Sequence, residues 1–219
     1  MTTVCMVVHA EGPGDLGNPP RSVPPGESLL LEERGPAHII VQRVLTEGAQ
    51  VPEGAIDFRE PLRTQTGTHA YGSKLLDQRV LDEILAGWLL NPLLVVFLVD
   101  SDDSKPNGRK SLLEKALERN QLEGAVGVAV KEFEAWLIAD SSALSTVLGG
   151  SKSSSSNLEA LPCRKAKKLL NQWSQEISTQ SRGLADIRKE LASAMDLDTV
   201  SNLCPSFKEF RQALLSVVT

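Results

Sequence analysis

The sequence has few cysteines and no long apolar run, and each shortage excludes a class of protein. Three cysteines, Cys5, Cys163 and Cys204, are spread over 219 residues and form no C-x-x-C pair. This spacing indicates reduced thiols and excludes a disulfide framework or a cysteine-rich zinc site. No apolar stretch approaches the roughly 18 residues that a membrane-spanning helix needs, and the N-terminus lacks a charged segment followed by an apolar one. We therefore expect a cytoplasmic protein with no membrane partner.

Positive charge is also scarce, because 23 Lys and Arg residues stand against 28 Asp and Glu residues, a formal net charge of −5. This balance argues against a surface covered in positive charge for nonspecific nucleic-acid binding. The net charge does not exclude a local basic groove, since carboxylates that hold a metal are neutralised when the site is loaded. Hydrophobic residues make up 41% of the chain, which is enough for a packed core.

Four short apolar runs predict the strands of one sheet, and amphipathic helical patterns alternate with them. The runs lie at residues 3–8, 55–58, 93–99 and 124–130. The helical patterns lie at residues 36–48, 73–90, 109–120 and 132–139. Continuous apolar runs are typical of parallel strands buried on both faces, and the alternation favours βαβ units. We therefore predict an α/β, Rossmann-like protein with a mainly parallel four-stranded sheet flanked by helices.

Two stretches of biased composition interrupt this pattern. Residues 12–36 are dense in Gly and Pro, and we expect no packed element there apart from a turn at Leu29–Leu31. Residues 149–157 contain G-G-S-K-S-S-S-S, which is typical of a flexible linker between an α/β domain at 1–148 and a helical region at 158–219. We expect that region to pack on or beside the core, with helices at residues 164–173, 183–194 and 206–217. Ser206 is the predicted N-cap of the last helix, with Glu209 completing a capping box.

Acidic residues follow three of the four predicted strands. They are Glu11, Asp100, Asp102, Asp103, Glu132 and Glu134. Because the carboxyl ends of parallel strands meet at one edge of a sheet, we expect these side chains to converge. Clustered carboxylates repel one another unless a cation is present, and Mg²⁺ prefers oxygen ligands. Taken one at a time, each motif also fits a plainer interpretation: a solvated turn, a glycine-rich turn, or the first turn of a helix.

Two of these motifs resemble the signatures of TOPRIM (topoisomerase–primase) domains, which occur in primases, topoisomerases and nucleases of the OLD (overcoming-lysogenisation-defect) type. The motifs are E-G-P-G-D from Glu11 to Asp15 and D-S-D-D from Asp100 to Asp103. Two further segments, A-V-K-E-F-E-A-W-L-I-A-D at 129–140 and C-P-S-F-K-E-F at 204–210, are similar to a family of small bacterial TOPRIM-like proteins. The resemblance spans most of the chain.

The resemblance implies a Mg²⁺-dependent site for phosphodiester cleavage, with Mn²⁺ as a substitute. Glu11, Asp100, Asp102 and Glu134 would be the catalytic residues and, with Asp103, the metal ligands; Glu132 is the second choice for Glu134. One or two ions would bind a phosphate oxygen and activate water for in-line attack. Relatives of this kind often lie beside ATPases in phage-defence or mobile-element systems, which implies an ATPase partner. The long Gly/Pro stretch after the first strand leaves the position of Asp15 open.

Basic residues near strand ends, and a basic run that opens the C-terminal region, are candidate phosphate contacts. They are Lys74, Lys105, Arg109, Arg164, Lys165 and Lys168. Ordinary solvated charge is the alternative for each of them. We expect a nucleic-acid substrate, DNA rather than RNA, and we leave a homodimer open. Two other functions compete with the nuclease: a non-catalytic regulatory subunit of an ATPase, and a transferase whose D-x-D motif holds a metal–nucleotide sugar.

Overall fold

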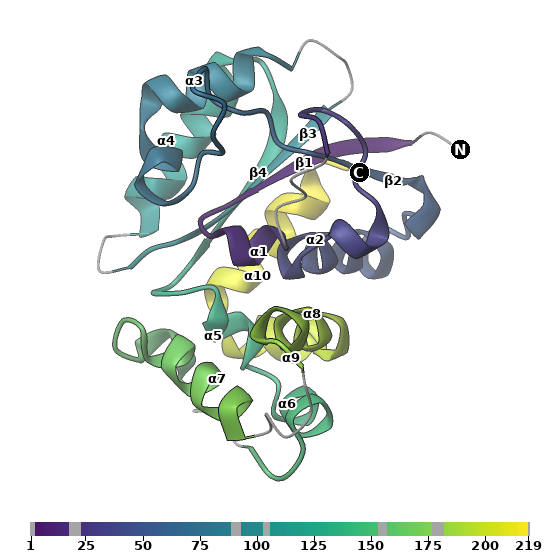
Figure 1. The fold of residues 1–219 in the computed structure, drawn as a ribbon, viewed down its shortest axis with the longest axis vertical. Coiled ribbons are helices and arrows are strands. Elements are labelled where there is room, and N and C mark those ends of the chain that lie inside the picture. Colours follow the sequence, from purple (N-terminus) through teal and green to yellow (C-terminus); the bar gives the residue numbers. More distant parts are fainter. Residues whose placement is uncertain are drawn as a thin grey trace.

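A four-stranded parallel sheet forms the centre of the molecule (Figure 1). The computed structural model describes residues 3–17, 23–88, 93–102, 106–152, 157–176 and 182–218. The strands are β1 (Val4–Ala10), β2 (Ile56–Arg59), β3 (Leu93–Asp100) and β4 (Glu123–Ala129), in the order β2-β1-β3-β4. Every neighbouring pair is parallel. The predicted α/β class and the four predicted strands are therefore confirmed.

Alternate residues of each strand enter two separate hydrophobic clusters. Met6 and Val8 of β1 belong to one cluster, and Val7 between them belongs to the other. Helices α2 (Pro36–Gly48) and α10 (Pro205–Ser216) cover the first face. Helices α3 (Gln78–Ala86) and α4 (Pro106–Arg119) cover the second. Burial on both faces explains why these strands are continuously apolar in the sequence.

A glycine in β4 allows α10 to approach the sheet closely. A Cβ atom on Gly127 would lie 2.8 Å from the ring of Phe210 and 2.6 Å from the side chain of Leu98. Phe210 in turn stacks on Trp136 of α5 (Glu134–Leu137), with ring centroids 5.8 Å apart. The C-terminal helix α10 therefore shares the main hydrophobic cluster with the sheet. The division into two regions at residues 149–157 stays a prediction.

The remaining C-terminal helices lie beyond the carboxyl edge of the sheet, at the opposite end of the molecule from α3 and α4 (Figure 1). They are α6 (Ser141–Leu148), α7 (Lys165–Glu176), α8 (Leu184–Ala194) and α9 (Leu197–Leu203), with a 3₁₀ turn at Leu158–Ala160. Asp140 joins two of them, because its Oδ1 accepts from Ser142 N at 2.8 Å and its Oδ2 from Asp196 N at 2.8 Å. The sequence predicted α7, α8 and α10 but neither α6 nor α9.

The helix expected at residues 73–90 is divided in two. A 3₁₀ turn (Gly72–Leu76) comes first, and α3 begins afterwards because the side chain of Asp77 accepts hydrogen bonds from Arg79 N and Val80 N. An N-cap aspartate accepts from free amides in the first turn of the helix that follows it, so it starts a new helix. The helix expected at residues 132–139 is likewise reduced to the short α5.

The Gly/Pro-rich stretch contains a short packed helix, so the expectation of no packed element apart from a turn at Leu29–Leu31 was wrong, although a turn does lie close to that position. Helix α1 (Pro13–Leu16) and a 3₁₀ turn (Leu31–Glu33) lie in it, and another 3₁₀ turn (Glu53–Ala55) precedes β2. A Cβ atom on Gly35 would lie 2.1 Å from Gly17 N, so glycine allows the two ends of this segment to touch. Residues 18–22 of the stretch lie outside the described residues.

The predicted cap of the last helix was also wrong. Helix α10 starts at Pro205 with Cys204 as its N-cap. Ser206 N donates to Glu159 Oε1 at 3.0 Å, and the Ser206 hydroxyl accepts from Trp136 Nε1 at 2.9 Å. The serine is therefore used to join separate segments instead of capping its own helix.

Candidate functional site

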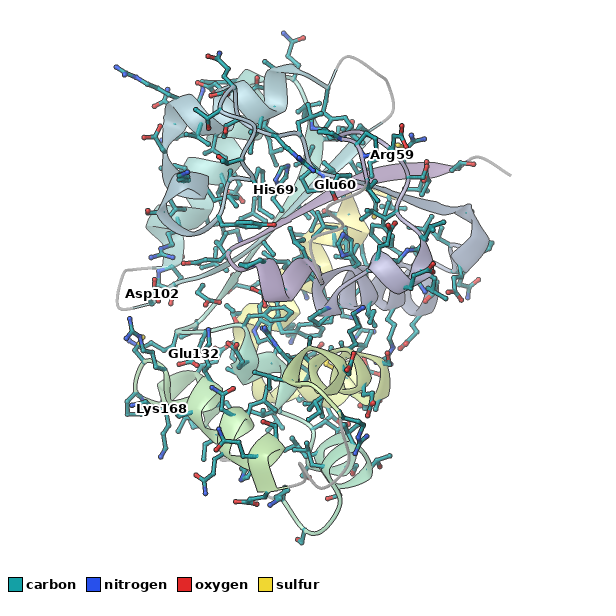
Figure 2. The ribbon with its side chains drawn as sticks, in the orientation of Figure 1. Arg59, Glu60, His69, Asp102, Glu132 and Lys168 are labelled. Atoms are coloured by element: carbon teal, nitrogen blue, oxygen red, sulfur yellow. The ribbon has the colours of Figure 1, made fainter. Side chains whose placement is uncertain are left out.

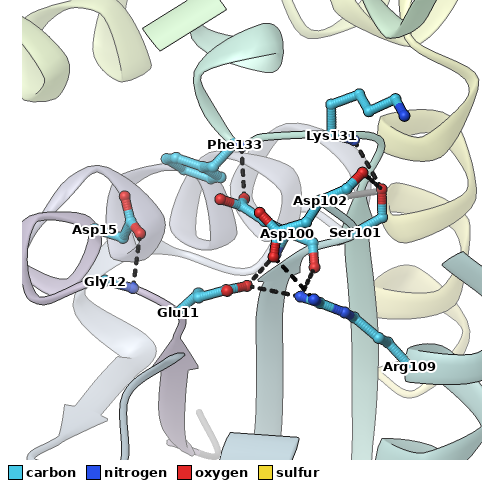
Figure 3. A network of polar contacts seen from close by, with 9 residues as sticks. All are labelled: Glu11, Gly12, Asp15, Asp100, Ser101, Asp102, Arg109, Lys131 and Phe133. Carbon is cyan, nitrogen blue, oxygen red and sulfur yellow. Dashed lines mark hydrogen bonds and ion pairs between the residues drawn. The ribbon is translucent and has the colours of Figure 1, made fainter. Parts of the chain in front are cut away.

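Glu11 lies directly after β1, and its side chain reaches the end of the neighbouring strand β3. Glu11 N donates to Leu98 O at 3.1 Å, and Glu11 Oε2 accepts from Asp100 N at 2.7 Å (Figure 3). The two acidic residues are 89 positions apart in the sequence. Adjacency of β1 and β3 in a parallel sheet puts both strand ends at one edge, and this brings the two residues together.

Asp100 is a largely buried carboxylate that is surrounded by other carboxylates. Its Oδ1 accepts from Phe133 N at 2.7 Å, and Phe133 follows β4 (Figure 3). Burial, followed by the negative charges of Glu134, Asp15 and Glu11, raises the pKa of Asp100 to about 8. A carboxyl group with this pKa holds a proton at neutral pH unless a cation takes the place of the proton.

Arg109 of α4 bridges two of the predicted site residues. Its Nη1 lies 3.2 Å from Glu11 Oε2 and its Nη2 lies 2.9 Å from Asp102 Oδ2. It also donates to the backbone oxygen of Asp100. The side chain of Asp102 is 50% exposed, so this side of the site is open to solvent. Arg109 was a predicted phosphate contact, and in this structure it neutralises carboxylates.

Arg188 of α8 bridges a second pair of carboxylates on the buried side of the site. It forms an ion pair with Asp15 Oδ1, and its Nη2 lies 3.1 Å from Glu134 Oε1. The side chains of Asp15 and Glu134 are only 12% and 5% exposed. A Cβ atom on Gly14 would lie 2.9 Å from Arg188 Nη1, so the second glycine of the E-G-P-G-D motif leaves room for the guanidinium group.

Glu132 has a different task from its neighbour Glu134. Its Oε2 accepts from Lys167 N at 2.6 Å in the first turn of α7. Its Oε1 is buried and has no hydrogen-bond partner among the described residues. Glu132 therefore fixes the start of α7 and leaves one buried oxygen that a donor or a cation would satisfy.

A cavity of about 680 Å³ joins these residues, a size typical of ligand sites, which occupy about 300–1,000 Å³. The lining carboxylates are Glu11, Asp15, Asp100, Asp102, Glu132 and Glu134. The lining cations are Lys131, Arg164, Lys167 and Arg188.

Backbone strain gathers at the same cavity. Asp102, Lys131 and Arg164 have positive φ angles of 48°, 69° and 63°. Residues other than glycine rarely adopt this conformation, and they often do so at functional sites. The strain and the acidic cluster therefore mark the same part of the molecule.

The other predicted residues lie away from the cavity or outside the described residues. Lys74 is exposed in the 3₁₀ turn before α3 and does not line the cavity. Lys165 and Lys168 are exposed on α7, next to lining residues. Asp103 and Lys105 lie outside the described residues. The predicted roles of all five residues stay predictions.

Sequence reasoning missed Arg188 and left the place of Asp15 open. One signal was available for Arg188: it lies at helical spacing with Leu191, Ala192 and Met195, all of them buried. A charged residue on the apolar stripe of a helix needs a buried partner. The identity of that partner is not encoded in the local sequence, because Asp15 lies 173 positions away.

The donors around the cavity suit a hard cation such as Mg²⁺, although they do not stand as a ready set of ligands. Among the described residues, no group of three or more His, Cys, Asp or Glu side chains has a geometry that could hold a metal ion. Arg109 and Arg188 hold four of the carboxylates. The raised pKa of Asp100 and the unpartnered Glu132 Oε1 nevertheless indicate uncompensated negative charge. Carboxylate oxygens are the ligands that Mg²⁺ prefers, so the residues fit the ion in their chemistry.

The fold and this cavity define an α/β protein with an acidic site at the carboxyl edge of a parallel sheet. The chain belongs to the family described as Domain of unknown function (DUF4276), whose profile matches residues 38–215. The match covers Asp100, Glu134 and Arg188 but begins after β1, so it does not include Glu11 or Asp15. No curated protein and no solved structure matches the chain. In the part of the chain that the structure describes, no helix combines the length and apolarity needed to cross a bilayer.

Proposed function

We propose that this chain is a Mg²⁺-dependent nuclease of the TOPRIM-like type, which cleaves phosphodiester bonds at the acidic cavity. The observation that supports this proposal most is that Glu11, Asp100 and Glu134, which end or follow three different strands, line one cavity. A structural role alone gives no reason to gather carboxylates from three strands in a buried place, since burial there raises the pKa of Asp100 and of Glu11 and opposes folding.

The ion would be held by Asp100, Glu11 and Asp102, with Glu134 as a further ligand and Mn²⁺ as a substitute for Mg²⁺. Bound there, Mg²⁺ would supply charge stabilisation to a phosphodiester group and lower the pKa of a coordinated water. Asp103 stays in the proposed ligand set, although it lies outside the described residues.

The two arginines would have separate tasks in the reaction. Arg109 lies at the open side of the cavity, next to Glu11 and Asp102, and would donate to phosphate oxygens as charge develops on them. Arg188 is buried with Glu134 and Asp15 and would hold these carboxylates in position. Arg188 is therefore a positioning residue in this proposal.

Asp100→Asn tests the proposal most directly. The wild-type chain should cleave labelled DNA in the presence of Mg²⁺ or Mn²⁺, and the variant should be at least about 100-fold slower, since even residues that only orient metal ligands contribute 10–100-fold. Asn has nearly the same shape as the protonated Asp100 that burial favours, so the variant should fold at least as well as the wild type.

Asp198→Asn is the matched control, because Asp198 is 78% exposed on α9, away from the cavity lining, and pairs with Arg211. This control should keep wild-type activity. Cleavage at the wild-type rate by Asp100→Asn would remove the proposed mechanism.

A non-catalytic regulatory subunit of an ATPase is the second candidate. The specific observation in its favour is that Arg109 and Arg188 already neutralise four carboxylates without a metal. Copurification with an ATPase, together with inactivity on DNA and RNA with both Mg²⁺ and Mn²⁺, would favour it over the nuclease. The transferase alternative stays a prediction and assigns no task to Glu11 or Glu134.

We further propose DNA as the preferred nucleic acid, an ATPase as a partner, a cytoplasmic location and a homodimer as the assembly to test first. These four proposals rest on the sequence and on the TOPRIM resemblance, and the acidic cavity is compatible with each.

A further inference from the structure

A cluster of cations lies at the rim of the acidic cavity, at the start of α7. It consists of Arg164, Lys165, Lys167 and Lys168, which we call the α7 basic turn. All four residues are exposed, and Arg164 and Lys167 line the cavity itself. Figure 2 shows Lys168 on the same side of the molecule as Glu132 and Asp102. The positive charge therefore continues outward from the cavity along one turn of helix.

The charged groups of this turn are available to a ligand. Glu132 accepts from the backbone amide of Lys167 and not from its ammonium group. Lys167 Nζ lies 3.9 Å from Glu134 Oε1, and its side chain is 59% exposed. Within the described residues, Arg164, Lys165 and Lys168 have no carboxylate within ion-pair distance. A negatively charged ligand would thus meet three cations, Arg164, Lys165 and Lys168, that the described residues do not neutralise, and a fourth, Lys167, that is paired with Glu134 at 3.9 Å.

The turn is fixed relative to the carboxylates of the cavity. Lys167 N donates to Glu132, which lies two residues before Glu134 in the chain. Arg164 is held in the left-handed region, and its carbonyl accepts from Lys168 N at 3.1 Å. The α7 basic turn forms the rim of the cavity, and the carboxylates that line the cavity form its acidic floor. These hydrogen bonds hold rim and floor in one arrangement, so a ligand can contact both at once.

The signs of charge on the floor and on the rim select the kind of ligand. A free cation would be attracted to the floor but repelled by the rim. A small anion such as one phosphate would need only one or two cations, whereas the basic turn continues to Lys165 and Lys168 outside the lining. A chain of phosphates satisfies both features, since one phosphate meets the floor through a cation and its neighbours meet the rim.

We propose that the α7 basic turn binds the phosphates that flank the one to be cleaved, so that the substrate is a nucleic-acid strand and not a mononucleotide or dinucleotide. The inference rests on the proposed function, because it assumes that the reacting phosphate lies at the acidic floor. It assigns Lys165 and Lys168 to strand binding and gives them no part in the chemical step.

The test compares two double variants that remove the same charge. Lys165→Gln/Lys168→Gln removes the outer part of the basic turn. Lys115→Gln/Lys208→Gln removes two exposed lysines from α4 and α10. Binding of a fluorescein-labelled DNA strand is measured by anisotropy over a series of salt concentrations in Ca²⁺, an oxygen-seeking cation that occupies carboxylate sites.

The first variant should bind the strand more weakly. Its slope of log binding constant against log salt concentration should be shallower by about 1.4, because each phosphate contact to a single strand contributes about 0.7 to that slope. The control should keep the wild-type slope. A labelled dinucleotide should bind the wild-type chain much more weakly than the strand, and neither double variant should change its affinity further.

The outcomes separate this inference from the nuclease proposal. Equal slopes in both double variants, equal affinity for dinucleotide and strand, or no binding of the strand would overturn the inference, even in a chain that cleaves DNA. Loss of slope in the α7 variant alone supports strand binding by the α7 basic turn. If the wild-type chain then cleaves nothing with Mg²⁺ or Mn²⁺, the nuclease proposal fails, and the inference is reduced to strand binding with no phosphate to be cleaved.

Discussion

The acidic cavity has two halves, each held by one arginine, and the halves differ in their exposure to water. Arg109 holds Glu11 and Asp102 on the open side, where the side chain of Asp102 is 50% exposed. Arg188 holds Asp15 and Glu134 on the inner side, where Glu134 is 5% exposed. The side chains of Arg109 and Glu11 are themselves only 16% and 21% exposed, so Asp102 is the residue that makes the open half the more accessible of the two to another cation.

Solvent explains the difference in energy between the halves. An ion pair next to water is screened, and its loss typically costs about 0–1 kcal/mol. Removing one partner of a buried pair leaves the other charge without compensation, and this costs about 3–5 kcal/mol. Asp100 lies between the halves, where Arg109 donates to its backbone oxygen and Phe133 N donates to its Oδ1, and a proton or a metal ion would neutralise its carboxyl group.

Arg188→Ala should give the largest effect, a loss of about 3–5 kcal/mol in the free energy of unfolding, because Asp15 and Glu134 would be left buried and unpaired. Urea denaturation followed by circular dichroism measures it. Arg211→Ala is the matched control, since its partner Asp198 is 78% exposed, and it should lose no more than about 1 kcal/mol. If Arg188→Ala loses as little free energy of unfolding as Arg211→Ala, the distinction between the two halves is contradicted.

The stability of the metal-free chain should fall as pH rises, because of Asp100. Its pKa is about 8 in the folded chain and about 3.9 in an unfolded one, so the protonated form stabilises the fold. This contribution is complete below about pH 4 and is lost as pH rises through about 8. Melting temperatures measured from about pH 5 to pH 9 should therefore decrease up to about pH 8 in the wild type, level off above it, and decrease less in Asp100→Asn.

Glu60 provides the control for this pH dependence. Burial raises its pKa to about 7, but it lies next to His69, with 3.3 Å between His69 Nε2 and Glu60 Oε1, and does not line the acidic cavity. Mg²⁺ should cancel the share of the pH dependence that comes from Asp100, whereas only Glu60→Gln should remove the share that comes from Glu60. If Mg²⁺ leaves the whole dependence unchanged, the cation does not bind beside Asp100.

Arg109→Ala should lose less stability than Arg188→Ala, about 1–3 kcal/mol, because water can solvate the 50% exposed Asp102, whereas Glu11 is only 21% exposed. The stabilisation of the variant by Mg²⁺ should be greater than that of the wild type, since Arg109 competes with the ion for Glu11 and Asp102. Thermal melts with increasing Mg²⁺ measure this difference. A smaller Mg²⁺ effect in the variant would mean that the open half is not where the ion enters.

Much of the sheet could be predicted because its strands have a simple signature. The segment L-L-V-V-F-L-V is apolar at every position, which fits only a strand covered on both faces or a buried helix, and Asn91-Pro92 and Asp100 limit its length. Convergence of Glu11 and Asp100 then follows from parallel order, since adjacent strand ends share one edge.

Other features depended on partners that are distant in the sequence. Ser206 has the sequence of an N-cap, yet Glu159 and Trp136 hold it elsewhere. Asp77 interrupts a pattern that local spacing predicts as one long helix, because its side chain caps the amides that follow. In both places a side-chain hydrogen bond decides the outcome, and such bonds are not visible in the apolar periodicity.

The sequence by itself determined the strands, their parallel arrangement and the edge of the sheet at which acidic residues gather, because apolar runs and their alternation with helices are local properties; the order β2-β1-β3-β4 was not predicted. Only the tertiary structure decided which cations neutralise which carboxylates. Helix α8 packs against α2 and thereby brings Arg188 to Asp15 across 173 positions of sequence. Charge compensation acts through space and requires a low-dielectric neighbourhood that exists only after the helices have packed, so the inner half of the cavity is a product of the fold.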